Sequence, residues 1–103
     1  RRFDASLQRL RGALAQARAK GFHAHVLETL AVFARLRNAQ GDGTTAAALW
    51  IFLSDQPALD EAIRAESREH LATAMLAPDV LAAASAQAAG MEVDRAVALL
   101  AAN

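Results

Sequence analysis

The sequence contains no cysteine and no tyrosine, and only two prolines and five glycines among its 103 residues. Without cysteine the chain can form neither a disulfide framework nor a thiolate site. Its longest weakly polar run, residues 80–91, is mostly alanine and is too short to cross a bilayer. No segment has the pattern of a signal peptide. We therefore expect a cytoplasmic protein that does not enter a membrane.

Alanine dominates instead, with 28 of the 103 residues, and hydrophobic residues make up 54% of the chain. Alanine has the highest helix propensity because it loses no side-chain entropy in a helix. Composition and length together predict one all-α domain over residues 1–103 with a modest core. Because the sequence starts at Arg1 without a methionine, we expect it to be a fragment of a larger protein.

The formal net charge is zero, but the two signs are unevenly placed along the chain. Residues 1–40 hold eight basic and two acidic side chains, a net charge of +6, whereas residues 41–103 carry −6. One interpretation is a nucleic-acid partner, whose phosphates would contact Arg9, Arg11, Arg18 and Lys20. The other is an acidic neighbouring segment of a longer protein. The second is favoured, because the basic residues form no dense run.

Apolar residues recur at helical spacing, and turn residues divide the chain into six segments. The first two stripes are Phe3, Leu7, Leu10, Leu14 and Ala17, followed by Phe22, Val26, Leu30, Phe33 and Leu36. Gly21 and Gly41 are expected to end these two helices. A third helix, capped by Asp42 or Thr44, is predicted to run to Leu53.

Three further helices are predicted in the second half of the chain. Pro57 is expected to open the fourth, in which Asp60 pairs with Arg64 four residues later. Its predicted inward face is Leu59, Ile63, His70, Leu71 and Met75. Pro78 and Gly90 bound the fifth helix. The sixth is predicted over residues 92–102, with the inward residues Val93, Ala96, Val97 and Leu100. Six helices with short connections predict three antiparallel hairpins in a right-handed stack.

Residues 28–57 contain two consecutive helical segments, which an Ala-Gln-Gly-Asp turn joins. A helix–turn–helix of about 30 residues has the size of one tetratricopeptide-like repeat. The positions of the pattern W-x2-L-G-x2-Y are occupied by Leu30, Phe33, Ala34 and Arg37, and those of A-x3-F by Ala46 and Trp50. Arg37 departs from the aromatic residue that is usual there. Trp50, the only tryptophan, is expected to pack in the core first and to serve as a ligand platform second.

The order of the segments resembles the closing part of the repeat region in large bacterial signal-transduction ATPases and LuxR-type transcription regulators. The matching segments are LAVFARLRNAQGD, QPALDEAIRAESREHLA and PDVLAAASAQAAGMEVDRAVALL, within residues 10–102. Glu92 departs from the Ser or Thr cap that is common in that family. The resemblance implies a TPR-like domain with a best-matched repeat at 28–57 and capping helices at 58–103. It also implies a scaffold for protein–protein or interdomain contacts in transcription regulation or signal transduction.

On such a repeat, four residues of the inner helix are expected to face a concave groove: Glu28, Ala31, Arg35 and Asn38. Arginine and asparagine side chains there can hold the carboxylate of a peptide partner through charge-assisted hydrogen bonds. An excised repeat also exposes the face that a neighbour would cover. The first helix is therefore the predicted surface for a homo-oligomer.

Residue patterns for catalysis or metal binding are incomplete. His23 and His25 are two residues apart, which on a helix turns them about 200° from each other. His70 is predicted to be a hydrogen-bonded core histidine, and Glu66 and Glu69 to lie on a solvated face. Gly41-Asp42-Gly43 is too short for a phosphate loop, and no serine lies in a G-x-S-x-G elbow. We expect no enzyme activity, no cofactor and no metal.

Overall fold

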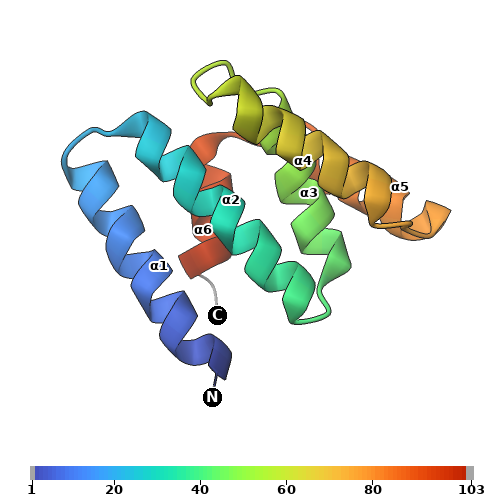
Figure 1. The fold of residues 1–103 in the computed structure, drawn as a ribbon, viewed down its shortest axis with the longest axis horizontal. Coiled ribbons are helices and arrows are strands. Elements are labelled where there is room, and N and C mark those ends of the chain that lie inside the picture. The colour runs from blue at the N-terminus through green and yellow to red at the C-terminus, as the bar shows by residue number, and fades with distance from the viewer. Residues whose placement is uncertain (1, 102–103) are drawn as a thin grey trace.

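The computed structural model describes residues 2–101, with side chains from residue 3 to residue 100. This part of the chain is all-helical, as predicted (Figure 1). It contains the helices α1 (Arg2–Ala19), α2 (His23–Ala39), α3 (Gly43–Ser54), α4 (Glu61–Thr73), α5 (Pro78–Ala88) and α6 (Val93–Ala101). The predicted end of the sixth helix at residue 102 lies outside the described residues. None of the described helices is long and apolar enough to cross a membrane.

Helix α3 lies at the centre of the fold and is buried on all sides. Its buried residues are Ala46, Ala47, Ala48, Leu49, Trp50, Phe52 and Leu53. A helix that is apolar all round needs cover from several neighbours. The neighbours are α2, α4 and α5, which all pack against α3 (Figure 1). The alanine side chains let these helices come close, while the larger side chains fill the space between them.

Left-handed glycines follow three of the helices at the predicted places. Gly21, Gly41 and Gly90 have φ angles of 72°, 88° and 71°. Glycine adopts this conformation without the steric penalty that a Cβ atom brings, which makes it the common residue after a helix. The start of α3 also follows the prediction, because the Asp42 side chain accepts a hydrogen bond from the Thr45 amide at 3.2 Å.

The start of α4 differs from the prediction. Pro57 lies in the turn between α3 and α4, and the helix begins four residues later, at Glu61. Asp60 is its N-cap and accepts a hydrogen bond from the Ala62 amide at 2.9 Å. The predicted pair of Asp60 with Arg64 is replaced, because the Asp60 carboxylate satisfies one of the free amides of the first helical turn.

Two residues predicted to face inward are exposed. Phe22 precedes α2 and is 51% exposed, and Met75 follows α4 and is 90% exposed. Both lie outside the helices, so the helical period that buries the other residues of their stripes does not apply to them. Met75 also has a φ of 51°, the left-handed region that non-glycine residues seldom adopt.

Helix α6 packs against α1 and α2 rather than forming a hairpin with α5 (Figure 1). Arg11 of α1 donates a hydrogen bond from Nε to the Leu100 carbonyl at 3.0 Å. Arg18 of α1 lies 2.9 Å from the Asp94 carboxylate at the start of α6. Helices α1, α2, α3 and α4 pack on one another in chain order, whereas α5 packs on α3 and α6 packs on α1 and α2.

Candidate functional site

The four residues predicted to line a groove lie along one face of α2. Glu28 and Ala31 are half-buried, and Arg35 and Asn38 are exposed. Glu28 lies 3.4 Å from Nδ1 of His25, and Ala31 packs against the core. Arg35 reaches across to α4. The structure therefore places α4 beside part of this face, and partner binding by the four residues stays a prediction.

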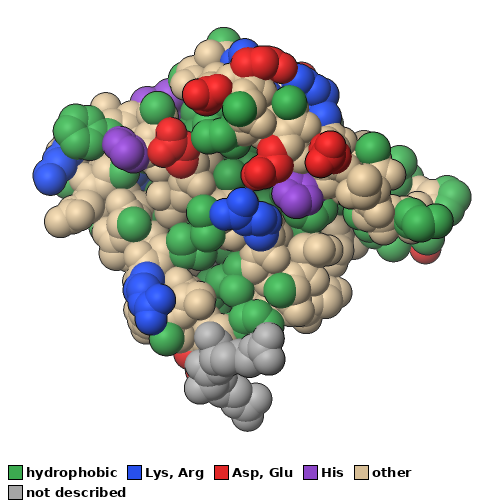
Figure 2. All heavy atoms as spheres, viewed as in Figure 1, with side chains coloured by type: hydrophobic (Ala, Val, Ile, Leu, Met, Phe, Trp, Pro, Cys, Tyr) green, Lys and Arg blue, Asp and Glu red, His purple; other side chains and the backbone are tan. Residues whose placement is uncertain are grey.

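Glu66 of α4 lies near Arg35 of α2 and near His70 of its own helix. Its Oε1 atom lies 3.4 Å from Nη1 of Arg35 and 3.9 Å from Nε2 of His70. The second distance is too long for a hydrogen bond. Figure 2 shows basic, acidic and histidine side chains gathered where α2 and α4 meet. The spacing of Glu66 and His70 was a signal of contact in the sequence, but the approach of Arg35 depends on how α2 packs on α4.

The imidazole of His70 stacks on Trp50 instead of making the predicted hydrogen bonds. The ring centroids are 4.8 Å apart, and the planes meet at 17°. Nε2 of His70 is buried and has no hydrogen-bond partner among the described residues. Trp50 is 2% exposed, which confirms the prediction that it packs in the core. The arrangement thus joins α3 and α4 by a ring contact, with a carboxylate near its edge.

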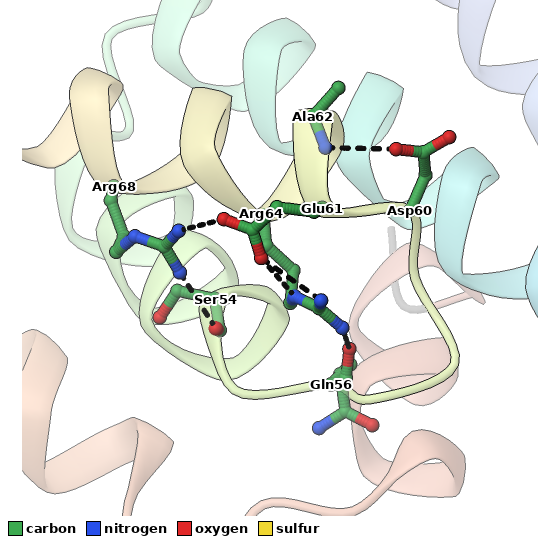
Figure 3. Close-up of polar contacts among 7 residues, drawn as sticks. All are labelled: Ser54, Gln56, Asp60, Glu61, Ala62, Arg64 and Arg68. Carbon is green, nitrogen blue, oxygen red and sulfur yellow. Dashed lines mark hydrogen bonds and ion pairs between the residues drawn. The ribbon is translucent and has the colours of Figure 1, made fainter.

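A second polar cluster ties the start of α4 to the end of α3 (Figure 3). Glu61 accepts hydrogen bonds from Arg64 at 3.0 Å and from Arg68 at 2.6 Å. The same arginines donate to the carbonyl groups of Gln56 at 2.9 Å and Ser54 at 3.4 Å. Hydrogen bonds from the two guanidinium groups lower the pKa of the Glu61 carboxyl.

The role of this second cluster is to hold the chain between α3 and α4. Carbonyl groups at the end of a helix lack partners within it and carry partial negative charge, so cationic donors are favourable there. Sequence reasoning missed the cluster because it paired Arg64 with Asp60, which is the N-cap of α4 and not part of the helix. The spacing of Glu61, Arg64 and Arg68 puts all three on one face of α4.

Hollows open along α1, whose packing partners are α2 and α6. One of about 500 Å³ between α1 and α6 has Leu14 and Val97 in its wall, beside Arg11 and Arg18. Another of about 280 Å³ between α1 and α2 has Phe22 at its rim. Pockets for small molecules measure roughly 300–1,000 Å³ and bury most of their ligand. The second hollow is therefore small for a molecule of that kind.

No group of three or more His, Asp or Glu side chains in the described part of the chain could hold a metal ion. His23 and His25 are both exposed, and the carboxylate near His25 is that of Glu28.

Comparisons of the chain with protein-family models, with curated proteins and with solved structures give no match. The resemblance to tetratricopeptide-like regulators therefore rests on the sequence patterns alone.

Proposed function

We propose that this chain is a non-enzymatic, TPR-like interaction module of a larger bacterial cytoplasmic regulator that acts in transcription or signalling. Its helices form a preformed scaffold, and its exposed apolar side chains contact a protein partner or a neighbouring domain. The resemblance of residues 10–102 to the repeat regions of such regulators supports the setting. The contact itself is supported by one structural observation, the conformation of Met75.

Met75 is both strained and exposed. A non-glycine residue in the left-handed region costs roughly 1–2 kcal/mol, and such strain tends to persist where it serves a function. Met75 is 90% exposed, and Leu81, six residues later on α5, is 43% exposed. Methionine is flexible and polarizable, so it adapts to the surface of a partner. An apolar tip of this kind suits protein recognition rather than catalysis.

The test is site-specific photo-crosslinking in the complete natural protein. A photoreactive side chain at position 75 is expected to give a defined protein crosslink, mapped by mass spectrometry to another domain or another chain. The matched control is position 55, since Asp55 is also an exposed turn residue. If position 75 gives no product beyond that of position 55, the proposed contact is absent.

The alternative is nucleic-acid binding by the basic first forty residues. Two of the four side chains that this function needs are engaged within the fold, because Arg11 bonds to Leu100 and Arg18 pairs with Asp94. Binding of duplex DNA that weakens steeply with salt, and that Arg9→Glu and Lys20→Glu abolish, would favour this alternative. We favour the interaction module because Arg11 and Arg18 make these contacts within the fold, which leaves fewer basic side chains to bind phosphate groups.

A further inference from the structure

Two exposed apolar side chains lie at opposite ends of the molecule. Phe22 is in the turn between α1 and α2, and Met75 is in the turn between α4 and α5, at the two ends of the longest axis (Figure 1). That axis measures 38 Å. Met75 is 90% exposed and Phe22 is 51% exposed, so both present apolar surface to another molecule. Figure 2 shows hydrophobic side chains at both of these ends.

The Phe22 end combines a shallow hollow with basic character. The hollow, of about 280 Å³, is lined by Ala13, Gln16, Ala17, Lys20, Phe22, His25 and Thr29. None of these residues carries a carboxylate, although that of Glu28 lies 3.4 Å from Nδ1 of His25. The rings of Phe22 and His25 are 5.8 Å apart and tilted by 48°, and Phe22 is 51% exposed. This surface fits an apolar side chain of another molecule that has an acidic side chain a few residues further along.

The Met75 end has the complementary features. Met75 is 90% exposed and Leu81 is 43% exposed, and Asp79 lies between them in the first turn of α5. Helix α5 contains no lysine or arginine. The tip thus presents a flexible apolar side chain with a carboxylate four residues further along the chain.

We propose that the Met75 end of one copy of this chain binds the Phe22 end of the next copy, head to tail. The thioether of Met75 enters the hollow against the Phe22 ring, a contact that sulfur and aromatic rings favour. Asp79 then lies near Lys20 of the other copy. This inference rests on the proposed function, since it names the partner of the same exposed Met75 tip.

Charge supports a second copy as the occupant. Lys20 lines the hollow at the Phe22 end, and Asp79 lies in the first turn of α5 at the Met75 end. These unlike charges attract when the two ends meet, whereas two Met75 ends would bring two carboxylates together. A contact between unlike ends is heterologous, and it can add a further copy at each free end. The hollow of about 280 Å³ is open to solvent and has Phe22 in its lining, which suits one inserted apolar side chain. Because the contact area is small, the association is weak and depends on concentration.

The experiment uses the complementarity of the two ends. Phe22→Glu removes the ring from the hollow and adds a carboxylate that repels Asp79, and it leaves the Met75 tip intact, whereas Met75→Glu removes the tip and leaves the hollow intact. Both residues are exposed, so the helical circular dichroism of each variant should equal that of the wild type. In sedimentation equilibrium at high protein concentration, the average mass of the wild type should rise past that of a dimer. Each variant alone should stay monomeric, and their equimolar mixture should approach a twofold mass and stop there.

A second experiment reverses the charges of Lys20 and Asp79 and leaves Phe22 and Met75 in place. Lys20→Glu should weaken the association of the wild type, and adding Asp79→Lys to it should restore the association by reversing both ends together. Arg9→Glu, which changes an exposed charge elsewhere on α1, should leave the association unchanged.

Two results would overturn the head-to-tail contact: a mixture of the two variants no heavier than either alone, or a single variant that associates as the wild type does. The proposed function can survive this failure. A crosslink from position 75 to a different protein, together with a monomeric mixture, would reject the second copy and keep the interaction module. If the crosslink is absent as well, both proposals are wrong.

Discussion

The imidazole of His70 lies almost parallel to the indole of Trp50, with ring centroids 4.8 Å apart. Trp50 is the only tryptophan of the chain, so its fluorescence reports on this one contact. Oε1 of Glu66 lies 3.9 Å from Nε2 of the same imidazole. The imidazole thus stacks on the indole with its face and has a carboxylate near its edge.

We expect His70→Gln to change the emission of Trp50, because it removes the ring that stacks on the indole. His25→Gln, at an exposed site on α2, should leave the emission unchanged. Emission spectra that are the same in all three proteins would contradict the assignment.

Glu61 predicts an effect of pH on stability. Hydrogen bonds from Arg64 and Arg68 hold the pKa of Glu61 below its usual range. In the unfolded chain these partners are lost, and a glutamate titrates near about 4.3. The folded state therefore binds the proton more weakly, so the contribution of Glu61 to stability is present above the unfolded pKa. It is lost as pH falls through the lower pKa of the folded state.

The measurement is urea unfolding of the wild type and of Glu61→Gln over a range of pH. The difference in unfolding free energy between them should shrink below about pH 4.3, where the carboxyl begins to be protonated in the unfolded chain. Arg64→Gln combined with Arg68→Gln removes the donors, and in that background the pH dependence of the difference should vanish. A difference that grows towards low pH would show that the sign is wrong.

The turn glycines give a prediction with an internal control. Gly41 has a φ of 88°, whereas Gly12 lies inside α1 and an added Cβ there meets nothing within 4 Å. Gly41→Ala is expected to lower the unfolding free energy by about 1–2 kcal/mol, because a Cβ atom disfavours the left-handed region. Gly12→Ala is expected to raise it by about 0.5–1 kcal/mol through helix propensity. Effects of equal sign in chemical denaturation would refute this reasoning.

Met75 should give opposite changes in stability and association. Met75→Gly relieves the left-handed strain, although glycine adds entropy to the unfolded chain, so a net gain of up to about 1 kcal/mol is expected. The same variant lacks the apolar tip and should lose head-to-tail association. Met75→Leu is the control, since it keeps an apolar side chain and the strain. If Met75→Gly is less stable than the wild type, the strain is not borne by this residue.

Local sequence signals predicted the helices well. They did not predict the arrangements that depend on contacts between residues far apart in the sequence. Gly21, Gly41 and Gly90 end their helices because a left-handed turn is a local property. Pro57 was misplaced because proline suits a turn as well as a first helical position. The packing of α6 on α1 includes a hydrogen bond from Arg11 to the Leu100 carbonyl, and these residues are 89 positions apart in the sequence. No local pattern contains that information.

The candidate site shows the same division. The period of α2 predicted that Arg35 and Asn38 share one face with Glu28, and the structure places them so. Arg35 on that face meets Glu66 because α4 packs near α2. The angle at which two helices cross depends on the shapes of all the side chains packed between them. The exposed positions of Phe22 and Met75 could not be predicted, because each continues an apolar stripe by one step beyond the end of its helix.

The all-round burial of α3 limits how this chain can be divided. Residues 28–57 match a repeat in sequence, but they contain only α3 and the part of α2 from Glu28 onwards. The surfaces of α3 that α4 and α5 cover would then meet water. Such a piece would aggregate rather than fold. The matched repeat therefore depends on α4 and α5 for its fold, and the smallest piece that keeps α3 covered runs from α2 to α5.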